Sequence, residues 1–303
     1  DLEFIYNYLN KIENRFAQRI IWGNLWQMVR DSVLSPIWYL ELVEKYADIE
    51  KDPTVLQTQI LQKALSIKGQ FLIEKNRIKW SEKLFQLSFK NLEKKQNNQF
   101  QISWFNVLLS CAESKDEIII LKGILYGKIK FKNLIIDQEK RWNIVTKLCA
   151  YGDSASEDLI KNEIKNDPGD LGEKRAFTAK VSVPKSEIKK KYWKIFTSNE
   201  QKHSSEYLTY GMDGFFWYKQ KHILEKYVDK FFENIKNIFE KKDVHYSTNF
   251  SSILFPDILA PEKICEKTMI VIENEKLPKL CKKNLIEEVD NLKRRIKILD
   301  KQK

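Results

Sequence analysis

Apolar residues recur every three or four positions through most of this chain, which is the spacing of one face of a helix. The repeat is clear over 20–29, 55–65, 142–149 and 228–239, and it returns in heptad-like steps between Leu277 and Leu299. The segment from Gly127 to Ile136 alternates as a strand does, and we expect it to form an extended connector between helices. The pattern therefore predicts an all-α protein.

Capping residues and prolines divide this helical pattern into short segments. Six positions carry residue types typical of helix N-caps: Ser35, Asp52, Ser114, Asp137, Ser154 and Asp167. Ser35, Asp52 and Asp167 each precede a proline, which favours the first turn of a helix. Ser114 and Ser154 each have a glutamate three residues later, the spacing of a capping box. We therefore predict many short helices joined by short breaks.

Short antiparallel helices in series predict a particular architecture. Helical hairpins that stack side by side form an α-solenoid with a concave face. No strict repeat consensus is visible, which argues against a regular repeat array. We predict a superhelix of stacked hairpins, of the HEAT or armadillo kind, that forms a concave bowl from a single domain over 1–303.

The composition adds charge but no clear anionic partner. The 303 residues carry a formal net charge of +11, and only eight of the 53 basic residues are arginine. Recognition of phosphate favours arginine, and no basic block is interleaved with aromatic residues, so we predict no nucleic-acid partner. The Lys189–Lys191 run is expected to be a solvated face. No apolar run is long enough to span a membrane, and we expect no membrane partner.

Cysteine and histidine usage gives no metal motif. Cys111, Cys149, Cys265 and Cys281 form no C-x-x-C pair, and each lies in an apolar helical context. We interpret them as buried free thiols, which indicates a reducing, cytoplasmic location. The three histidines are far apart and no H-E-x-x-H motif occurs, so the sequence shows no zinc motif.

The order of the landmarks nevertheless resembles a known family. Five segments carry the resemblance: WGNLWQMVRDSVLSPIWYLELV (22–43), EKDPTVLQTQILQKA (50–64), DQEKRWNIVTKLCAYG (137–152), NEIKNDPGDLGEKRAFTAKVSVP (162–184) and GFFWYKQKHILEKYVDKFFENIKNIF (214–239). Together they are similar to the C-terminal helical domain of zinc aminopeptidases of the aminopeptidase N family, gluzincin metallopeptidases, and most similar to its bacterial branch. The resemblance runs from about Leu9 to Leu299.

The resemblance implies a function without catalytic residues in this chain. In that family the zinc ligands lie in an upstream catalytic module, and the helical domain closes over the active-site cleft and walls a chamber for peptide substrates. We therefore expect no catalytic residue, metal ligand or cofactor here, zinc in the upstream module of the parent enzyme, and that module and peptides as partners. Gly211-Met212-Asp213-Gly214 only superficially echoes the family's substrate-amine loop and departs at its last position.

Three arginines are candidates for cations that face the chamber. Arg30, Arg141 and Arg175 are singled out because arginine is scarce here and binds a peptide carboxylate at two points. The alternative is structural: Arg30 pairs with Asp31 at a helix end, and Arg141 ties hairpins together through Asp137 or Glu139.

Two other functions compete with the aminopeptidase reading. An independent helical-repeat scaffold for protein partners would begin with a polar capping helix, and the apolar Phe4, Ile5, Tyr6 and Tyr8 argue against it. A basic helical nucleic-acid binder would bind with steep salt dependence. Asp1 is not an initiator methionine, so we expect a piece of a longer protein, with the tryptophan-rich hairpin 22–43 at its domain junction.

Overall fold

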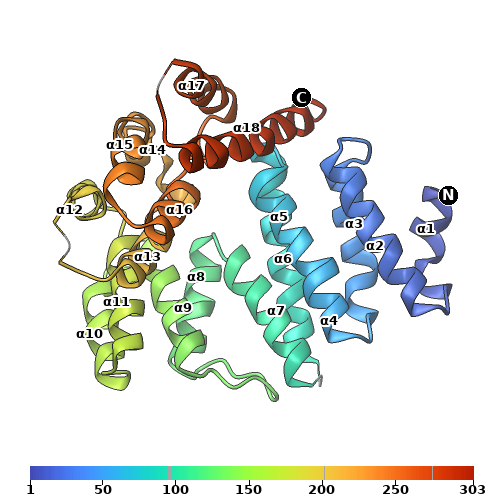
Figure 1. Ribbon diagram of the computed structural model, residues 1–303. Coiled ribbons are helices and arrows are strands. Elements are labelled where there is room, and N and C mark those ends of the chain that lie inside the picture. Colours follow the sequence, from blue (N-terminus) through green and yellow to red (C-terminus); the bar gives the residue numbers. More distant parts are fainter. Residues whose placement is uncertain (95–96, 201, 275) are drawn as a thin grey trace. The chain divides into compact units, whose positions relative to one another are not determined.

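The computed structural model describes residues 1–94, 97–200, 202–274 and 276–303. Every regular element in these ranges is a helix, which confirms the predicted all-α class (Figure 1). The segment 127–136 is an irregular connector without a strand, as expected. None of the helices in the described part of the chain has the length and apolar character needed to cross a bilayer.

The chain divides into two compact units, which we describe separately. Unit 1 comprises residues 1–135 and 294–303, and unit 2 comprises residues 136–293. The concave solenoid and the single domain stay predictions.

The helices of unit 1 follow each other with short connections. They are α1 (Leu2–Tyr8), η1 (Leu9–Lys11), α2 (Arg15–Arg30), α3 (Pro36–Tyr46), η2 (Ala47–Ile49), α4 (Pro53–Val55), η3 (Leu56–Leu61), α5 (Gln62–Gln70), α6 (Glu74–Glu93), α7 (Asn98–Cys111) and α8 (Lys115–Leu125). Among these helices, α6 and α7 pack together most extensively. Trp22 is 2% exposed and packs edge-on against Tyr39, with ring centroids 5.4 Å apart.

The helices of unit 2 surround an aromatic core. They are α9 (Gln138–Ala150), α10 (Ser156–Asn166), α11 (Asp170–Ser182), α12 (Ser186–Thr197), α13 (Ser205–Asp213), η4 (Tyr218–Gln220), α14 (Lys221–Leu224), α15 (Tyr227–Lys241), α16 (Val244–Ile253) and α17 (Pro261–Asn274). The last helix, α18 (Lys279–Asp300), begins in unit 2, and its residues from Arg294 belong to unit 1. Phe215 packs against Trp193 and Tyr227, with ring centroids 5.4 and 4.9 Å away.

Four of the six predicted N-caps are confirmed. Ser35, Asp52 and Asp137 each accept a hydrogen bond from a backbone N–H of the first turn, and Ser114 and Glu117 form the complete capping box. These caps succeed because each interaction is local, between residues two or three positions apart.

Two predicted N-caps are wrong. α10 begins at Ser156 without a side-chain cap from Ser154, and Asp153 instead accepts the backbone N–H of Ala155. α11 begins at Asp170 with Gly169 as its N-cap. The carboxylate of Asp167 is instead bound by the indole N–H of Trp142, at 2.9 Å. Tertiary partners therefore override the local capping preference there.

One helix of unit 1 contains a π-helical stretch that the apolar pattern does not predict. α4, η3 and α5 run without interruption from Pro53 to Gln70, and η3 is π-helical. A π-helix shifts the backbone hydrogen-bond ladder by one residue. The hydroxyl of the fully buried Tyr39 donates to the carbonyl oxygen of Gln59 in this stretch, at 2.7 Å. The interruption thus coincides with a buried side-chain contact from α3.

All four cysteines are buried free thiols, as predicted. Burial raises the pKa of the Cys149 thiol to about 12, and that of Cys265 also lies above its ordinary value. Protonated, buried thiols are poor nucleophiles, so these two cysteines have a packing role.

The expected solvated lysine run is wrong for one of its members. Lys190 and Lys191 are exposed, but Lys189 is completely buried. Its side-chain nitrogen Nζ donates to the carbonyl oxygens of Val181 and Phe215, at 2.9 and 2.7 Å, and to that of Gly214 at 3.4 Å. Lys189 therefore satisfies carbonyl groups at the ends of α11 and α13, which have no acceptor role inside their own helices.

Candidate functional site

Arg141 lies near the start of α9 and forms a two-point ion pair with Glu163 of α10. Its Nε lies 2.7 Å from one carboxylate oxygen of Glu163, and a terminal nitrogen lies 2.8 Å from the other. Only 3% of the Glu163 side chain is exposed. We predicted either a chamber-facing cation or a tie between helices through Asp137 or Glu139. The structure shows a tie, and its acceptor is Glu163.

The Glu163 carboxyl is held in its charged form by this arrangement. Burial by itself raises the pKa of Glu163, but the hydrogen bonds from Arg141 and Gln138 outweigh it and hold the pKa below its ordinary value. The Gln138 amide nitrogen lies 2.6 Å from the same carboxylate. Glu163 is therefore an anion that needs these donors.

Arg175 of α11 joins the same group of helices. Its guanidinium lies 3.6 Å from a carboxylate oxygen of Asp167 and 4.0 Å from one of Glu139. Asp167 links it to α9 through Trp142. We call Arg141, Glu163, Asp167, Arg175 and Glu139 the α9–α11 charge network. It holds two cations and three carboxylates, so it offers no excess positive charge to a substrate anion.

Arg30 lies in unit 1, in the last turn of α2, and is half-buried. Its guanidinium donates to the side-chain oxygen of Gln27 at 3.4 Å. Among the described residues no carboxylate lies within 4.0 Å of it, and the expected pair with Asp31 does not form. Arg30 therefore keeps donors that an incoming carboxylate would use.

Removing Arg141 is expected to destabilise the chain, because it leaves the buried Glu163 carboxylate without its main partner. We expect Arg141→Met to lower the free energy of unfolding by about 2–3 kcal/mol at neutral pH. The pKa of Glu163 is lowered in the folded state, so the pair stabilises above the unfolded pKa and its contribution is lost as the pH falls. Urea denaturation of both proteins at neutral and acidic pH measures this. A difference that stays constant as the pH falls contradicts it.

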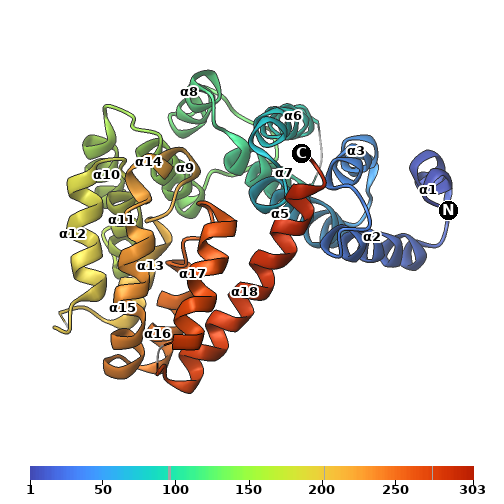
Figure 2. The same ribbon diagram turned by 90° about the horizontal axis from the view of Figure 1, so that it is seen from above.

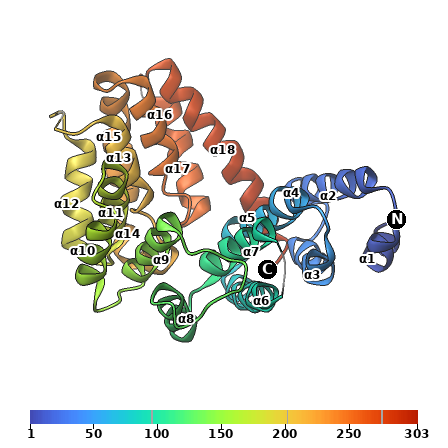
Figure 3. The same ribbon diagram turned by 90° about the horizontal axis from the view of Figure 1, so that it is seen from below.

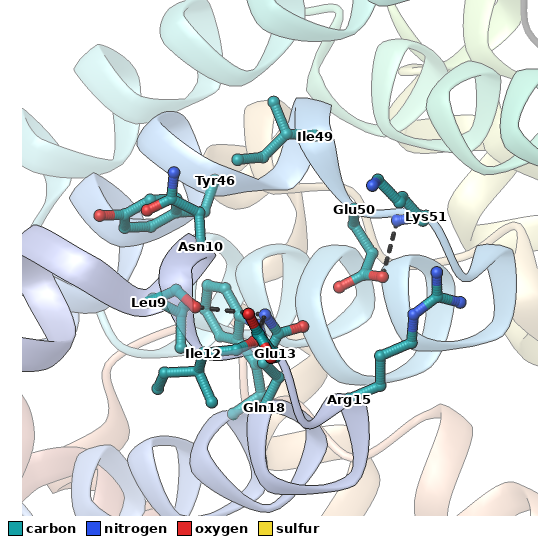
Figure 4. Close-up of a pocket in the computed structure, with 11 residues that line it drawn as sticks. Leu9, Asn10, Ile12, Glu13, Arg15, Gln18, Tyr46, Ile49, Glu50 and Lys51 are labelled. Carbon is teal, nitrogen blue, oxygen red and sulfur yellow. Dashed lines mark hydrogen bonds between the residues drawn. The ribbon is translucent and has the colours of Figure 1, made fainter.

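The sequence did not reveal a pocket in unit 1 (Figure 4). Its volume is about 460 Å³, and it lies between η1, the start of α2 and the end of α3 with η2. The lining residues are Leu9, Asn10, Ile12, Glu13, Arg15, Gln18, Trp22, Tyr46, Ile49, Glu50 and Lys51. The pocket wall contains apolar side chains together with acidic and basic ones. These residues are scattered over 43 positions of the printed sequence, so no single motif marks the pocket.

Part of that wall is fixed by hydrogen bonds. The Gln18 amide donates to the carbonyl oxygens of Leu9 and Ile12, at 3.2 and 2.7 Å. The Glu50 carboxylate accepts the backbone N–H groups of Lys51 and Asp52, at 2.7 and 2.8 Å. These hydrogen bonds fix the Gln18 and Glu50 side chains in the pocket wall.

No metal centre is assembled in the described part of the chain. It contains no group of three or more His, Cys, Asp or Glu side chains with the proximity to hold an ion. His203 stacks on Tyr207, and His245 lies 3.3 Å from the side chain of Asn249.

The Gly211–Gly214 segment has a packing explanation. Gly211, Met212 and Asp213 form the end of α13 rather than a substrate-binding loop. A Cβ atom on Gly211 would lie 2.3 Å from the ring of Phe177, so only glycine lets these helices approach. The stacked pair Phe177–Tyr207, with ring centroids 4.6 Å apart, belongs to the same contact.

Comparison with known proteins places the chain in a family. A family model described as "ERAP1-like C-terminal domain" matches residues 4–294. Aminopeptidase N of Streptomyces lividans is 22% identical over 268 residues, which cover 88% of this chain and 31% of that protein. The chain thus spans about a third of the length of this relative. Both findings confirm the resemblance drawn from the sequence, including its bacterial branch. The chain belongs to the ERAP1-like C-terminal domain family.

Proposed function

We propose that this chain is the C-terminal domain of a zinc-dependent aminopeptidase that removes N-terminal residues from peptides. In this proposal the domain covers the active-site cleft and walls the substrate chamber, and it contributes no catalytic residue. The observation that carries the proposal is the family match over residues 4–294. The name of the bacterial relative supports the activity of the parent protein.

The proposal assigns zinc to another part of the parent protein. The described residues do not fit a metal site, because no three ligand side chains come together. A bound zinc ion would polarise the scissile carbonyl and activate water. In this proposal, the present chain forms the wall of a chamber that admits unstructured peptides. A cytoplasmic location, inferred from the cysteines, belongs to the same proposal.

Peptidase assays of two proteins test this division of labour. The parent protein is expected to release N-terminal residues from peptides and to lose that activity when a chelator removes its metal. The 303-residue chain alone is expected to hydrolyse nothing, with or without added zinc. Hydrolysis by the chain alone, sensitive to the chelator, would contradict the proposal.

Among the three predicted chamber cations, we propose Arg30 for contact with the substrate's C-terminal carboxylate. Arg141 and Arg175 already face carboxylates, whereas within the described part of the chain Arg30 donates to the Gln27 amide oxygen and contacts no carboxylate. An arginine binds a carboxylate with two parallel hydrogen bonds, which a half-buried position strengthens. The proposal therefore gives carboxylate binding to Arg30 and leaves Arg141 and Arg175 in their ion pairs.

Arg30→Ala in the parent enzyme is expected to raise KM for peptides by about fivefold, because a half-exposed ion pair contributes about 1 kcal/mol. The same peptides with a C-terminal amide are expected to show little change, since they lack the carboxylate. Arg19→Ala, at an exposed position on the same helix, serves as the matched control. Equal effects on acid and amide peptides would remove the assigned role.

A further inference from the structure

The first two helices of unit 1, α1 and α2, expose several large apolar side chains. No residue of α1 is buried, and its Phe4 and Tyr8 side chains are 55% and 43% exposed. On α2, Phe16 and Ile20 are 71% and 45% exposed. We call these four residues the α1–α2 apolar surface. Each pair is spaced by four residues, so each forms a stripe along one helix face.

Other exposed apolar side chains of unit 1 do not form such stripes. Within its described residues they stand one to a helix or in connections: Val33, Ile49, Ile78, Ile119, Tyr126 and Ile135. Single exposed apolar side chains are ordinary on protein surfaces, whereas contiguous ones mark interaction sites. Phe4 and Tyr8 are in ring contact, with centroids 5.4 Å apart, and Phe16 and Ile20 lie one turn apart, so these two pairs differ from the single side chains elsewhere in the unit.

The position of α1 leaves this surface uncovered by the rest of its unit. All three views place α1 at the outer edge of unit 1, beyond α2 and α3 (Figures 1, 2 and 3). Its attachment is local: the Tyr6 carbonyl oxygen accepts from Lys45 and from the Tyr46 hydroxyl, at 2.8 and 2.9 Å. These contacts fix one side of α1 and leave Phe4 and Tyr8 free to contact another body.

The pocket of Figure 4 adjoins these helices, because its wall includes η1, which directly follows α1, and the first half of α2. Leu9, Ile12 and Trp22 supply apolar wall, while Glu13 and Arg15 at the rim are exposed. Protein interfaces combine aromatic anchors with a polar rim, and their strongest contacts are side chains that fill a pocket. The α1–α2 apolar surface and the pocket together provide the same features: exposed aromatic side chains, a polar rim and a recess.

We infer that the α1–α2 apolar surface and the adjoining pocket form the interface with the preceding domain of the same polypeptide. The inference rests on the proposed function. The family model describes a C-terminal domain, and 69% of the length of the aminopeptidase N relative lies outside the match, as 31% lies within it. The matched region begins at residue 4, so α1 is the first helix of the matched domain and lies on the side from which a preceding domain of such a parent would come.

Tethering favours this occupant over a second copy of the chain. A domain joined directly to α1 reaches the surface at a high effective concentration, set by a short connection. A second copy must instead lose its translational and rotational freedom to bind. The preceding domain is therefore expected to bury Phe16 and Phe4 and to place one of its own apolar side chains in the pocket.

Site-specific photo-cross-linking in the full-length parent protein tests the inference. The photoreactive residue p-benzoyl-phenylalanine replaces Phe16, and in a control it replaces Ile78 of α6, which is 54% exposed in the same unit. We expect position 16 to cross-link within the same polypeptide to peptides of the preceding domain. We expect the control at position 78 to lose that product.

The outcomes separate this inference from the proposed function. Suppose that the parent is an active aminopeptidase but position 16 links to a second copy, to another protein or to nothing. The inferred interface with the preceding domain is then wrong, and the proposed function is unaffected. If position 78 gives the same intramolecular product as position 16, the inferred interface is likewise wrong. If the parent has no aminopeptidase activity or no preceding domain, both the inferred interface and the proposed function are wrong.

Discussion

Arg77→Met is expected to lower the free energy of unfolding of this chain by about 3–5 kcal/mol, the cost of breaking a buried ion pair. Arg77 of α6 is 3% exposed, and one terminal nitrogen lies 2.7 Å from both carboxylate oxygens of Glu113. Its Nε and other terminal nitrogen lie 3.3 and 3.1 Å from Glu74. The substitution would leave the Glu113 carboxylate, 11% exposed, without its main cation.

The cluster connects three helices, which is why a large effect is expected. Lys68 of α5 and Ser81 of α6 also contact Glu113, at 3.5 and 3.3 Å, just after the end of α7. Burial alone lowers the pKa of Arg77, but the hydrogen bonds that Arg77 donates to Glu74 and Glu113 reverse this and raise the pKa above its ordinary value. The arginine therefore stays charged at every pH at which the chain is folded.

A salt bridge on the same helix provides the control. Lys83 and Glu44 are also 2.7 Å apart, but their side chains are 37% and 45% exposed. Lys83→Met is expected to change the free energy of unfolding by no more than about 1 kcal/mol. Urea denaturation of the three proteins at neutral pH measures both effects. Similar losses for the two variants would show that burial is not what gives the Arg77 cluster its strength.

Lys189→Met is expected to cost about 2–3 kcal/mol of folding stability, because it removes a donor from buried carbonyl groups. Methionine has a similar length and fits an apolar site, so the change isolates the amino group. The carbonyl oxygen of Gly214 keeps the Trp217 indole N–H as a second partner, at 3.0 Å. Those of Val181 and Phe215 lose their hydrogen bonds from Lys189, and this loss produces the cost.

The same lysine makes stability depend on pH in the alkaline range. Burial lowers the pKa of Lys189 from 10.5 to about 7. Between these values the unfolded chain holds a proton that the folded chain does not hold. The contribution of Lys189 to stability therefore rises as the pH rises from 7 to 10.5, and it is constant below 7.

Urea denaturation at several pH values between 7 and 10.5 measures this contribution as the difference between the original chain and Lys189→Met. We expect the original chain to gain stability relative to the variant as the pH rises. Lys190→Met, at the exposed neighbouring position, is the control and is expected to follow the original chain. A difference between the original chain and Lys189→Met that falls with rising pH would show that the folded state prefers the ammonium.

The helices and most of their starts were predictable because they depend on neighbours in the sequence. The caps at Ser35, Asp52, Ser114 and Asp137 each use an interaction across two or three residues. The failure at Asp167 has a different origin: its carboxylate is engaged by Trp142, 25 positions away, and lies near Arg175. A local pattern contains no information about such partners.

The burial of Lys189 had a signal that the composition concealed. The buried positions of α12 are Lys189, Tyr192, Trp193 and Phe196, which follow the i, i+3, i+4, i+7 spacing of one helix face. The three consecutive lysines suggested a solvated surface, but helical spacing assigns the first of them to the apolar face. Periodicity was therefore the better guide than charge.

The role of the aromatic opening of the chain depends on which of its residues are buried. The tryptophan-rich hairpin 22–43 was expected at a domain junction, and this stays a prediction; within the chain, Trp22 is buried against Tyr39 and Trp26 packs on Phe71. The apolar residues left exposed in these first helices are Phe4, Tyr8, Phe16 and Ile20. Sequence alone cannot distinguish an aromatic residue that fills the core from one that faces a partner, because both favour the same residue types.

The candidate arginines show the same limit. Scarcity selected Arg30, Arg141 and Arg175, but it did not select Arg77, which has the most extensively paired guanidinium of these four in the described structure. Glu113 and Glu163, the carboxylates that contact Arg77 and Arg141 from other helices or their ends, lie 36 and 22 positions away in the chain, whereas Glu74 contacts Arg77 from the same helix. Their roles therefore depend on tertiary structure.

The central claim is that this chain is one domain of a larger aminopeptidase, and the native polypeptide tests it most directly. An antibody against this segment would capture the protein from its cells, and peptide mass spectrometry would give its mass and sequence. We predict a much longer chain whose preceding peptides include an H-E-x-x-H motif. A native chain that begins near Asp1 would contradict the claim and leave a free-standing helical scaffold.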